Sequence, residues 1–82
     1  MDYYLFICRS VTYAQRTMKA LKDVGIRAQM QRAPRDLTQR GCAYAVQVAP
    51  HFFDRARERL LQQGLVPSGI FARSGEEYIE VS

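Results

Sequence analysis

The hydrophobic pattern at the start of the chain predicts a strand followed by an amphipathic helix. Residues 2–8 are a run of aromatic and aliphatic side chains, which is typical of a strand and too short for a buried helix. Over residues 10–24 apolar side chains recur at helical spacing, at Val11, Ala14, Met18 and Leu21. Ser10 stands before this stripe as an N-cap, and Gly25 stands after it as a C-terminal stop.

The middle of the chain changes to a period of two, which predicts strands. Residues 26–32 form a strand with one face in water and are ended by Pro34; the apolar side consists of Ile26, Ala28 and Met30. Residues 42–48 predict a third strand, after a loop that is rich in arginine and turn residues. By the same period, one face of this third strand carries Cys42, Tyr44, Val46 and Val48.

The last part of the chain predicts a second helix and further strands. Residues 50–63 begin with a proline, end before Gly64 and carry an apolar stripe of Phe53, Ala56 and Leu60, widened by Phe52 and Leu61. Residues 65–71 predict a fourth strand, and Pro67 within it favours a position at the edge of the sheet. Residues 71–82 alternate weakly and predict an extra short strand or a tail.

The end of each predicted helix repeats the same pattern. Residues 21–26 read L-K-D-V-G-I and residues 60–65 read L-L-Q-Q-G-L, so that a leucine, a glycine and an aliphatic residue recur in one register. Each segment closes a helix and opens a strand, which divides the chain into two strand-helix-strand units. We therefore predict a single α+β domain over residues 1–82, a ferredoxin-like βαββαβ sandwich whose antiparallel sheet carries both helices on one face.

Composition and charge narrow the classes of function. The formal net charge is +4, and ten of the twelve basic residues are arginine, which suits planar oxyanions and phosphates. Two cysteines 34 positions apart and one histidine, His51 in the exposed first turn of the second helix, form no ligand pattern, so we expect neither a metal nor a cofactor. The apolar run at the N-terminus is too short for a signal peptide or a membrane span. This predicts a cytoplasmic protein with reduced thiols and no membrane contact.

The residues before the third strand are the candidate site for chemistry. Cys42 follows Gly41 at the junction of loop and strand, and Arg35 and Arg40 precede it in the loop. Positive charge beside a partly exposed thiol favours the thiolate, which is the nucleophilic form. We therefore expect Cys42 to be the reactive residue, with a pKa below that of a free cysteine, about 8.5. Gly41, Arg35 and Arg40 are the residues expected to stabilise its anion.

The predicted topology also places the start of the first helix at this site. In a ferredoxin-like sheet the end of the first strand, the start of the first helix and the loop between the second and third strands lie at one edge. Cys8, Ser10 and Cys42 are then expected to be neighbours, and the helix that begins after Ser10 would direct its unpaired N–H groups toward an anion there. Cys8 is the secondary thiol, because the end of an apolar strand is more typical of a core residue.

Four short motifs carry a resemblance to a known family. They are Tyr4-Leu5-Phe6, Gly25-Ile26, Ala33-Pro34-Arg35 and Arg40-Gly41-Cys42, followed by Tyr44 and Val48. In this order and spacing they resemble the Se/S carrier protein-like family over residues 2–71, with Ala43 where the family usually has glycine. The resemblance implies a sulfur or selenium carrier in which Cys42 takes the atom from a protein donor, such as a cysteine desulfurase, and passes it to an acceptor enzyme. A protein of this kind is at most a thiol-based transfer protein that acts with partner enzymes.

Two other functions stay open at this point. Residues 40–45 resemble the ribonucleoprotein octapeptide of RNA-recognition domains, which lies on the third strand of the same general fold. In the phase of that octapeptide Gln47 would face the core while Val46 and Val48 faced water, and Cys42 replaces the first stacking ring, so nucleic acid is the less favoured partner. The other function is a non-catalytic interaction or regulatory module, in which Cys42 is structural, as free cysteines commonly are.

Overall fold

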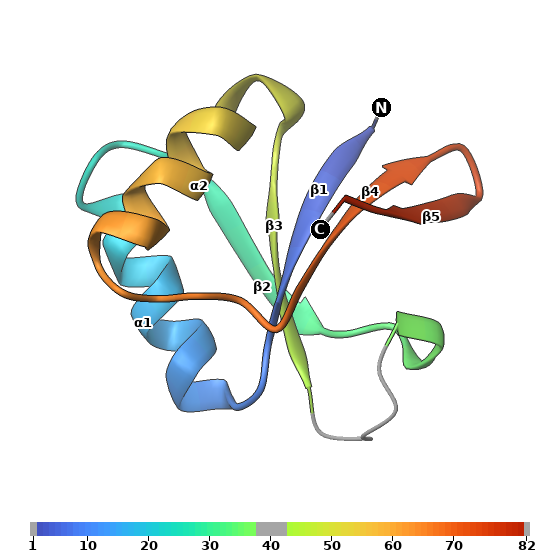
Figure 1. The fold of residues 1–82 in the computed structure, drawn as a ribbon, viewed down its shortest axis with the longest axis horizontal. Helices are drawn as coiled ribbons and strands as arrows, with labels where there is room; N and C mark the ends of the chain where they lie inside the picture. The colour runs from blue at the N-terminus through green and yellow to red at the C-terminus, as the bar shows by residue number, and fades with distance from the viewer. Residues whose placement is uncertain (1, 38–42, 82) are drawn as a thin grey trace.

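The chain folds into one antiparallel sheet whose strands lie in the order β2-β3-β1-β4-β5 (Figure 1). The structure is a computed structural model that describes residues 2–37 and 43–81. Its strands are β1 (Tyr3–Cys8), β2 (Ala28–Arg32), β3 (Tyr44–Val48), β4 (Gly69–Ser74) and β5 (Glu77–Glu80). Its helices are α1 (Val11–Lys22) and α2 (Phe53–Gln62), with two 3-10 turns, η1 (Arg35–Leu37) and η2 (Pro50–Phe52). Both long helices cover the same face of the sheet, so the first four strands confirm the predicted ferredoxin-like α+β fold.

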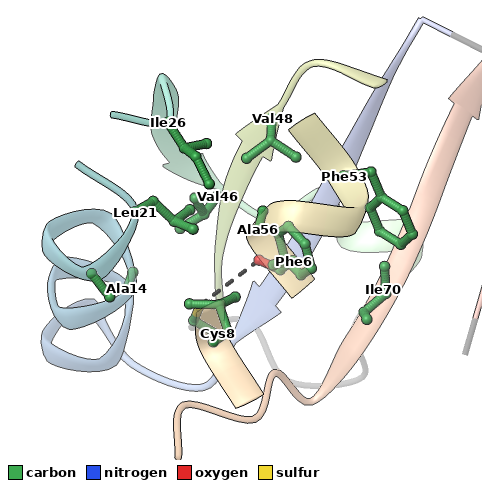
Figure 2. Close-up of a cluster of buried hydrophobic side chains, with 12 residues drawn as sticks. Phe6, Cys8, Ala14, Leu21, Ile26, Val46, Val48, Phe53, Ala56 and Ile70 are labelled. Atoms are coloured by element: carbon green, nitrogen blue, oxygen red, sulfur yellow. Dashed lines mark hydrogen bonds between the residues drawn. The ribbon is translucent and has the colours of Figure 1, made fainter. Parts of the chain in front are cut away.

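The main core lies between the sheet and the two helices. Phe6 is fully buried and pairs with Val46 on one side and Ile70 on the other, at the centre of the sheet. The apolar faces of the helices close over these strands, as Figure 2 shows for Ala14, Leu21, Phe53 and Ala56. The Phe53 ring stacks 3.9 Å from the Tyr4 ring, measured between centroids, which adds a directional contact to the burial. This face of the sheet is what holds α1 and α2 in place.

The repeated leucine and glycine at the helix ends form the same turn twice. Ile26 N–H donates to Leu21 O at 3.0 Å, and Leu65 N–H donates to Leu60 O at 2.9 Å. The glycine before each donor has a positive φ, 76° at Gly25 and 68° at Gly64, a conformation that glycine adopts without steric cost. Both turns are Schellman motifs, so the repeat in the sequence is a repeat of helix-ending geometry.

Two arginines of α2 bind the C-terminal end of α1. Val24 N–H donates to Leu21 O rather than to Ala20 O, the acceptor that a continuing α-helix would use. Arg59 Nε donates to Ala20 O at 3.0 Å, and an Arg55 guanidinium N–H donates to Val24 O at 3.2 Å. Because the C-terminal end of a helix carries partial negative charge, these cations also favour the helix dipole. The two helices are therefore joined by polar contacts as well as by the core.

A second apolar cluster covers the opposite face of the sheet. Leu5, Ile7 and Ala45 are almost fully buried there. The side chains that cover them come from β1, from the β4–β5 hairpin and from the segment that follows β2; they are Tyr3, Phe71, Tyr78, Ala33, Leu37 and Ala43. The hydroxyls of Tyr3 and Tyr78 lie 3.3 Å apart, and this hydrogen bond raises the pKa of Tyr3. The sheet consequently has side chains packed on both faces.

Pro67 was expected inside an edge strand, and that prediction is wrong. β4 begins at Gly69, two residues after the proline, and pairs with β1 on one side and β5 on the other. The proline therefore never has to donate to the ladder, which removes the reason for an edge position. The tail supplies the edge strand instead, since β5 pairs with β4 through a tight turn at Gly75, confirming the extra short strand.

Three residues placed on apolar faces by periodicity are exposed. Val11 is exposed because it begins α1, beyond the part of the helix that packs on the sheet, and Met30 because it lies on the edge strand β2. Leu61 stands at the margin of the α2 stripe and is 62% exposed. The element bounds also differ by a few residues, since β2 begins at Ala28 and α2 follows a separate 3-10 turn.

Candidate functional site

The end of the sheet at which β1 stops is the region expected to hold the reactive thiol. Cys8, the last residue of β1, pairs with Tyr44, the first residue of β3. Ser10 follows at once and begins α1, so the end of β1, the start of α1 and the start of β3 share one end of the sheet (Figure 1). This is the edge that the ferredoxin-like topology predicted. Arg40, Gly41 and Cys42 themselves lie outside the described residues.

Ser10 acts as the N-cap of α1. Its extended backbone, with φ −152° and ψ 163°, lets the Oγ atom accept the Tyr13 N–H at 3.1 Å. Its carbonyl accepts the Ala14 N–H at 3.0 Å, which starts the regular helix. Ser, Thr, Asn and Asp are preferred here because they satisfy donors that the helix leaves unpaired. The hydroxyl oxygen of Ser10 is therefore already used as an acceptor within the fold.

Cys8 is a core residue. It is 1% exposed and belongs to the main core between the sheet and the helices. Its sulfur lies 3.8 Å from the Phe6 carbonyl oxygen (Figure 2) and also 3.8 Å from Thr17 Oγ1. Burial raises the pKa of the Cys8 thiol, and the hydrogen bond between Cys8 and Thr17 only partly opposes this. A thiol held neutral and out of contact with solvent is a poor nucleophile. Cys8 is thus placed as the sequence predicted, in the core.

Arg35 lies on the other side of the sheet from the start of α1. It belongs to η1, which Figure 1 shows beside the sheet face opposite to both helices. The apolar side chain of Leu37 anchors this turn on the second cluster, and Ala33 N–H donates to Ala43 O at 3.1 Å at the base of the segment. Arg35 itself is exposed. Cys8 and Ser10 therefore lie together at one end of the sheet, whereas Arg35 lies apart from Ser10, on the opposite side of the sheet.

Tyr44 settles the orientation of β3 and bears on the RNA-binding alternative. It packs against the helix-side core, as do Val46 and Val48, which are 0% and 1% exposed. An aromatic ring on this face lies under the helices and offers no platform for a base to stack on. Of the residues that resemble the ribonucleoprotein octapeptide, the described Tyr44 therefore lies on the wrong face of the sheet for stacking on RNA.

Sequence reasoning missed Thr17 as the polar partner of Cys8. Thr17 is 1% exposed, and its hydroxyl donates to Tyr13 O at 3.0 Å, so this polar group is hydrogen-bonded inside the core. The signal was present, because Thr17 follows Ala14 by three positions and precedes Leu21 by four, on the same helical face.

Among the described residues, no three histidine, cysteine or acidic side chains are grouped closely enough to hold a metal ion. No described helix is long and apolar enough to cross a bilayer.

The fold and the position of the cysteines define a small ferredoxin-like α+β protein with one thiol in its core and a second at the β2–β3 connection. Residues 3–72 match the model of the family described as "Putative Se/S carrier protein-like", and the chain belongs to that family. The match spans β1 through most of β4 and includes the position of Cys42. Neither the curated protein sequences nor the solved structures include a significant match to this chain.

Proposed function

We propose that this protein is a sulfur or selenium carrier and that Cys42 holds the atom in transit. Membership of the family described as a Se/S carrier is the observation that carries the proposal, because the matched segment contains Cys42. Such a carrier needs a protein donor and an acceptor enzyme as partners. A cysteine desulfurase is a suitable donor, because it carries sulfur as a persulfide. The protein would work in the cytoplasm, where its thiols stay reduced, and would need neither a metal nor a cofactor of its own.

The proposed transfer is an exchange between a thiolate and a persulfide. The Cys42 thiolate attacks the outer sulfur of a donor persulfide, a new S–S bond forms to Cys42, and the S–S bond within the donor breaks. The donor leaves as a thiolate, and the proton on the outer sulfur travels with that sulfur. Atoms and electrons balance, so no oxidant or reductant is required. A selenium atom in the outer position follows the same course, and a second exchange with the acceptor releases it.

The state of Cys8 supports Cys42 as the carrier. Cys8 is buried to 1% exposure and burial raises its pKa, so it supplies neither the access nor the thiolate that exchange requires. The chain has two cysteines, which leaves Cys42 for the role. Arg35, Arg40 and the backbone at Gly41 are the groups proposed to stabilise its anion, with the start of α1 after Ser10 at the same end of the sheet.

The test is persulfide loading followed by mass spectrometry. Reduced protein incubated with a cysteine desulfurase and cysteine should gain one sulfur mass on the tryptic peptide that contains Cys42, and a reductant should remove it. Cys42→Ser should not load, whereas Cys8→Ala should load like the wild type. Substituting Arg35 and Arg40 by alanine should slow loading, and this difference should shrink at high salt.

The opposite result would redirect the assignment. If Cys42 stays unmodified with several persulfide donors while Cys8 or no residue is loaded, the carrier function fails. The interaction or regulatory module, with two structural cysteines, then takes its place.

A further inference from the structure

A small apolar pocket lies between α2 and the segment that leads into β4. Its volume is about 340 Å³, near the lower end of the roughly 300–1,000 Å³ range of pockets that enclose small molecules. Core residues form the apolar floor of the pocket, namely Phe6, Leu60 and Ile70. Its rim is formed by the side chains of Arg57, Leu61 and Val66 and by residues 67–69.

The apolar rim of this pocket is unusually exposed. Leu61 is 62% exposed and Val66 is 56% exposed, which makes them the two most exposed large apolar side chains in the described residues. Their apolar surface continues the surface of the pocket outward. A ligand enclosed by a 340 Å³ pocket would leave both side chains largely in water, whereas a protein surface would cover them. The rim therefore favours a protein partner.

The charge of the rim is positive. Arg57 is the charged side chain that lines the pocket, and it precedes Leu61 by four positions, on the same face of α2. On the other side of the pocket, Tyr13 Oη donates to Val66 O at 3.1 Å, and the Arg9 guanidinium lies 5.7 Å from the centre of the Tyr13 ring. Arginine beside exposed apolar side chains is the composition that protein interfaces favour. A complementary partner would present an apolar side chain next to a carboxylate.

The pocket is joined to the end of β1. Ser68, on the pocket rim, donates to Ile7 O through its backbone N–H at 2.8 Å and through its hydroxyl at 3.1 Å. The next residue, Cys8, pairs with Tyr44, which is two positions from Cys42 in the sequence. The pocket is thus attached to the end of β1, which pairs with the start of β3, and Cys42 precedes the first residue of β3 by two positions in the sequence.

We propose that this pocket docks the protein that delivers sulfur or selenium to Cys42, through an apolar side chain flanked by aspartate or glutamate. The inference rests on the proposed carrier function. The apolar side chain enters the pocket over Ile70 and Leu60. Leu61 and Val66 cover its flanks, and Arg57 pairs with the carboxylate. Such contacts orient the donor persulfide and raise the rate of encounter without taking part in the exchange itself.

The experiment compares a protein donor with a small one. Loading of Cys42 is measured with the cysteine desulfurase and, separately, with glutathione persulfide, which needs no docking surface. Leu61→Asp and Arg57→Glu should each slow loading from the desulfurase at least tenfold, the equivalent of about 1.4 kcal/mol, and leave loading from glutathione persulfide within twofold of wild type. Matched controls at the other end of the sheet, Ile79→Asp and Arg27→Glu, should leave both rates unchanged. Added salt should slow desulfurase loading of the wild type and have less effect on Arg57→Glu.

The outcomes separate this inference from the function on which it rests. If the pocket variants load from the desulfurase as fast as the controls do, the docking site is refuted and the carrier function stands. The docking site is also refuted, and the carrier function stands, if glutathione persulfide loads the wild type but the desulfurase does not. If neither donor loads wild-type Cys42, the carrier function and the docking site fall together. Circular dichroism and urea unfolding check that Leu61→Asp and Arg57→Glu remain folded, as expected for exposed positions.

Discussion

Replacing Arg59 by methionine should destabilise the fold through loss of one hydrogen bond at the end of α1. Methionine keeps most of the apolar stem, so the change removes chiefly the 3.0 Å bond from Arg59 Nε to Ala20 O. The bond is partly buried and has a charged donor, a class worth about 1.5–3 kcal/mol, and the favourable contact with the helix dipole overlaps with it. We therefore expect a loss of about 2 kcal/mol in the free energy of unfolding, or roughly 8–16 °C in Tm for a domain of this size.

Arg55 provides the matched control on the same helix. It donates to Val24 O at 3.2 Å, but this bond is exposed to solvent, so Arg55→Met should cost only about 0.5 kcal/mol. Urea unfolding monitored by circular dichroism measures both differences. A loss below about 0.5 kcal/mol for Arg59→Met, or an equal loss for both variants, would refute the view that burial makes the Ala20 contact the stronger one.

Two further predictions concern stability. Gly64→Ala should lower the free energy of unfolding, measured in urea, by about 1–2 kcal/mol, because the φ angle of +68° is unfavourable for alanine. A Cβ atom at this position meets no neighbour, so a neutral result would contradict the explanation from backbone conformation. For Cys8, a pKa raised by burial means that the folded state holds the thiol proton more tightly than the unfolded chain does. This contribution is fully present below about pH 8.5 and is lost as the pH rises through the folded pKa, so the unfolding free energy of the wild type should fall more steeply above pH 8.5 than that of Cys8→Ala. Parallel pH profiles for the two proteins would contradict this linkage between the Cys8 pKa and stability. At neutral pH, Cys8→Ala should lower the free energy of unfolding by about 1 kcal/mol.

Local signals were enough to predict most of the elements. Ser10 forms its cap from its own side chain and the next three residues, and the turns at Gly25 and Gly64 each close within six residues. Such features depend on neighbours in the chain, which the sequence lists directly. The predicted phase of β3 is also confirmed, because the side chains of Val46 and Val48 follow the period of two.

Features that depend on distant parts of the chain were less predictable. The interior position of β4 follows from the pairing of β5 with its free edge, and the exposure of Met30 follows from the place of β2 at the margin of the sheet. Leu61 belongs to the helical stripe by spacing, yet it lies at the rim of the pocket beside α2 and is 62% exposed. Helical spacing alone does not show how much of a stripe the sheet covers.

The candidate site was predictable to the same extent. The topology brought Cys8 and Ser10 to the end of the sheet where β3 begins, as the arrangement of strands implied. Burial of Cys8 followed from its place in an apolar strand. The side on which Arg35 lies is set by Leu37, which packs on the second cluster. Leu5 and Ile7 of that cluster are far away in the chain, and a loop without periodicity carries no signal for such a contact.

The reactivity of the two thiols in the native protein tests the assignment of Cys42 most directly. Iodoacetamide labelling should be followed peptide by peptide with mass spectrometry between pH 5 and 10, before and after denaturation. We predict that Cys42 is labelled in the folded protein, with a rate that titrates below the value of about 8.5 for a free cysteine, while Cys8 is labelled only on unfolding. If both cysteines react slowly and equally until the protein unfolds, Cys42 is a structural residue and the carrier assignment is contradicted.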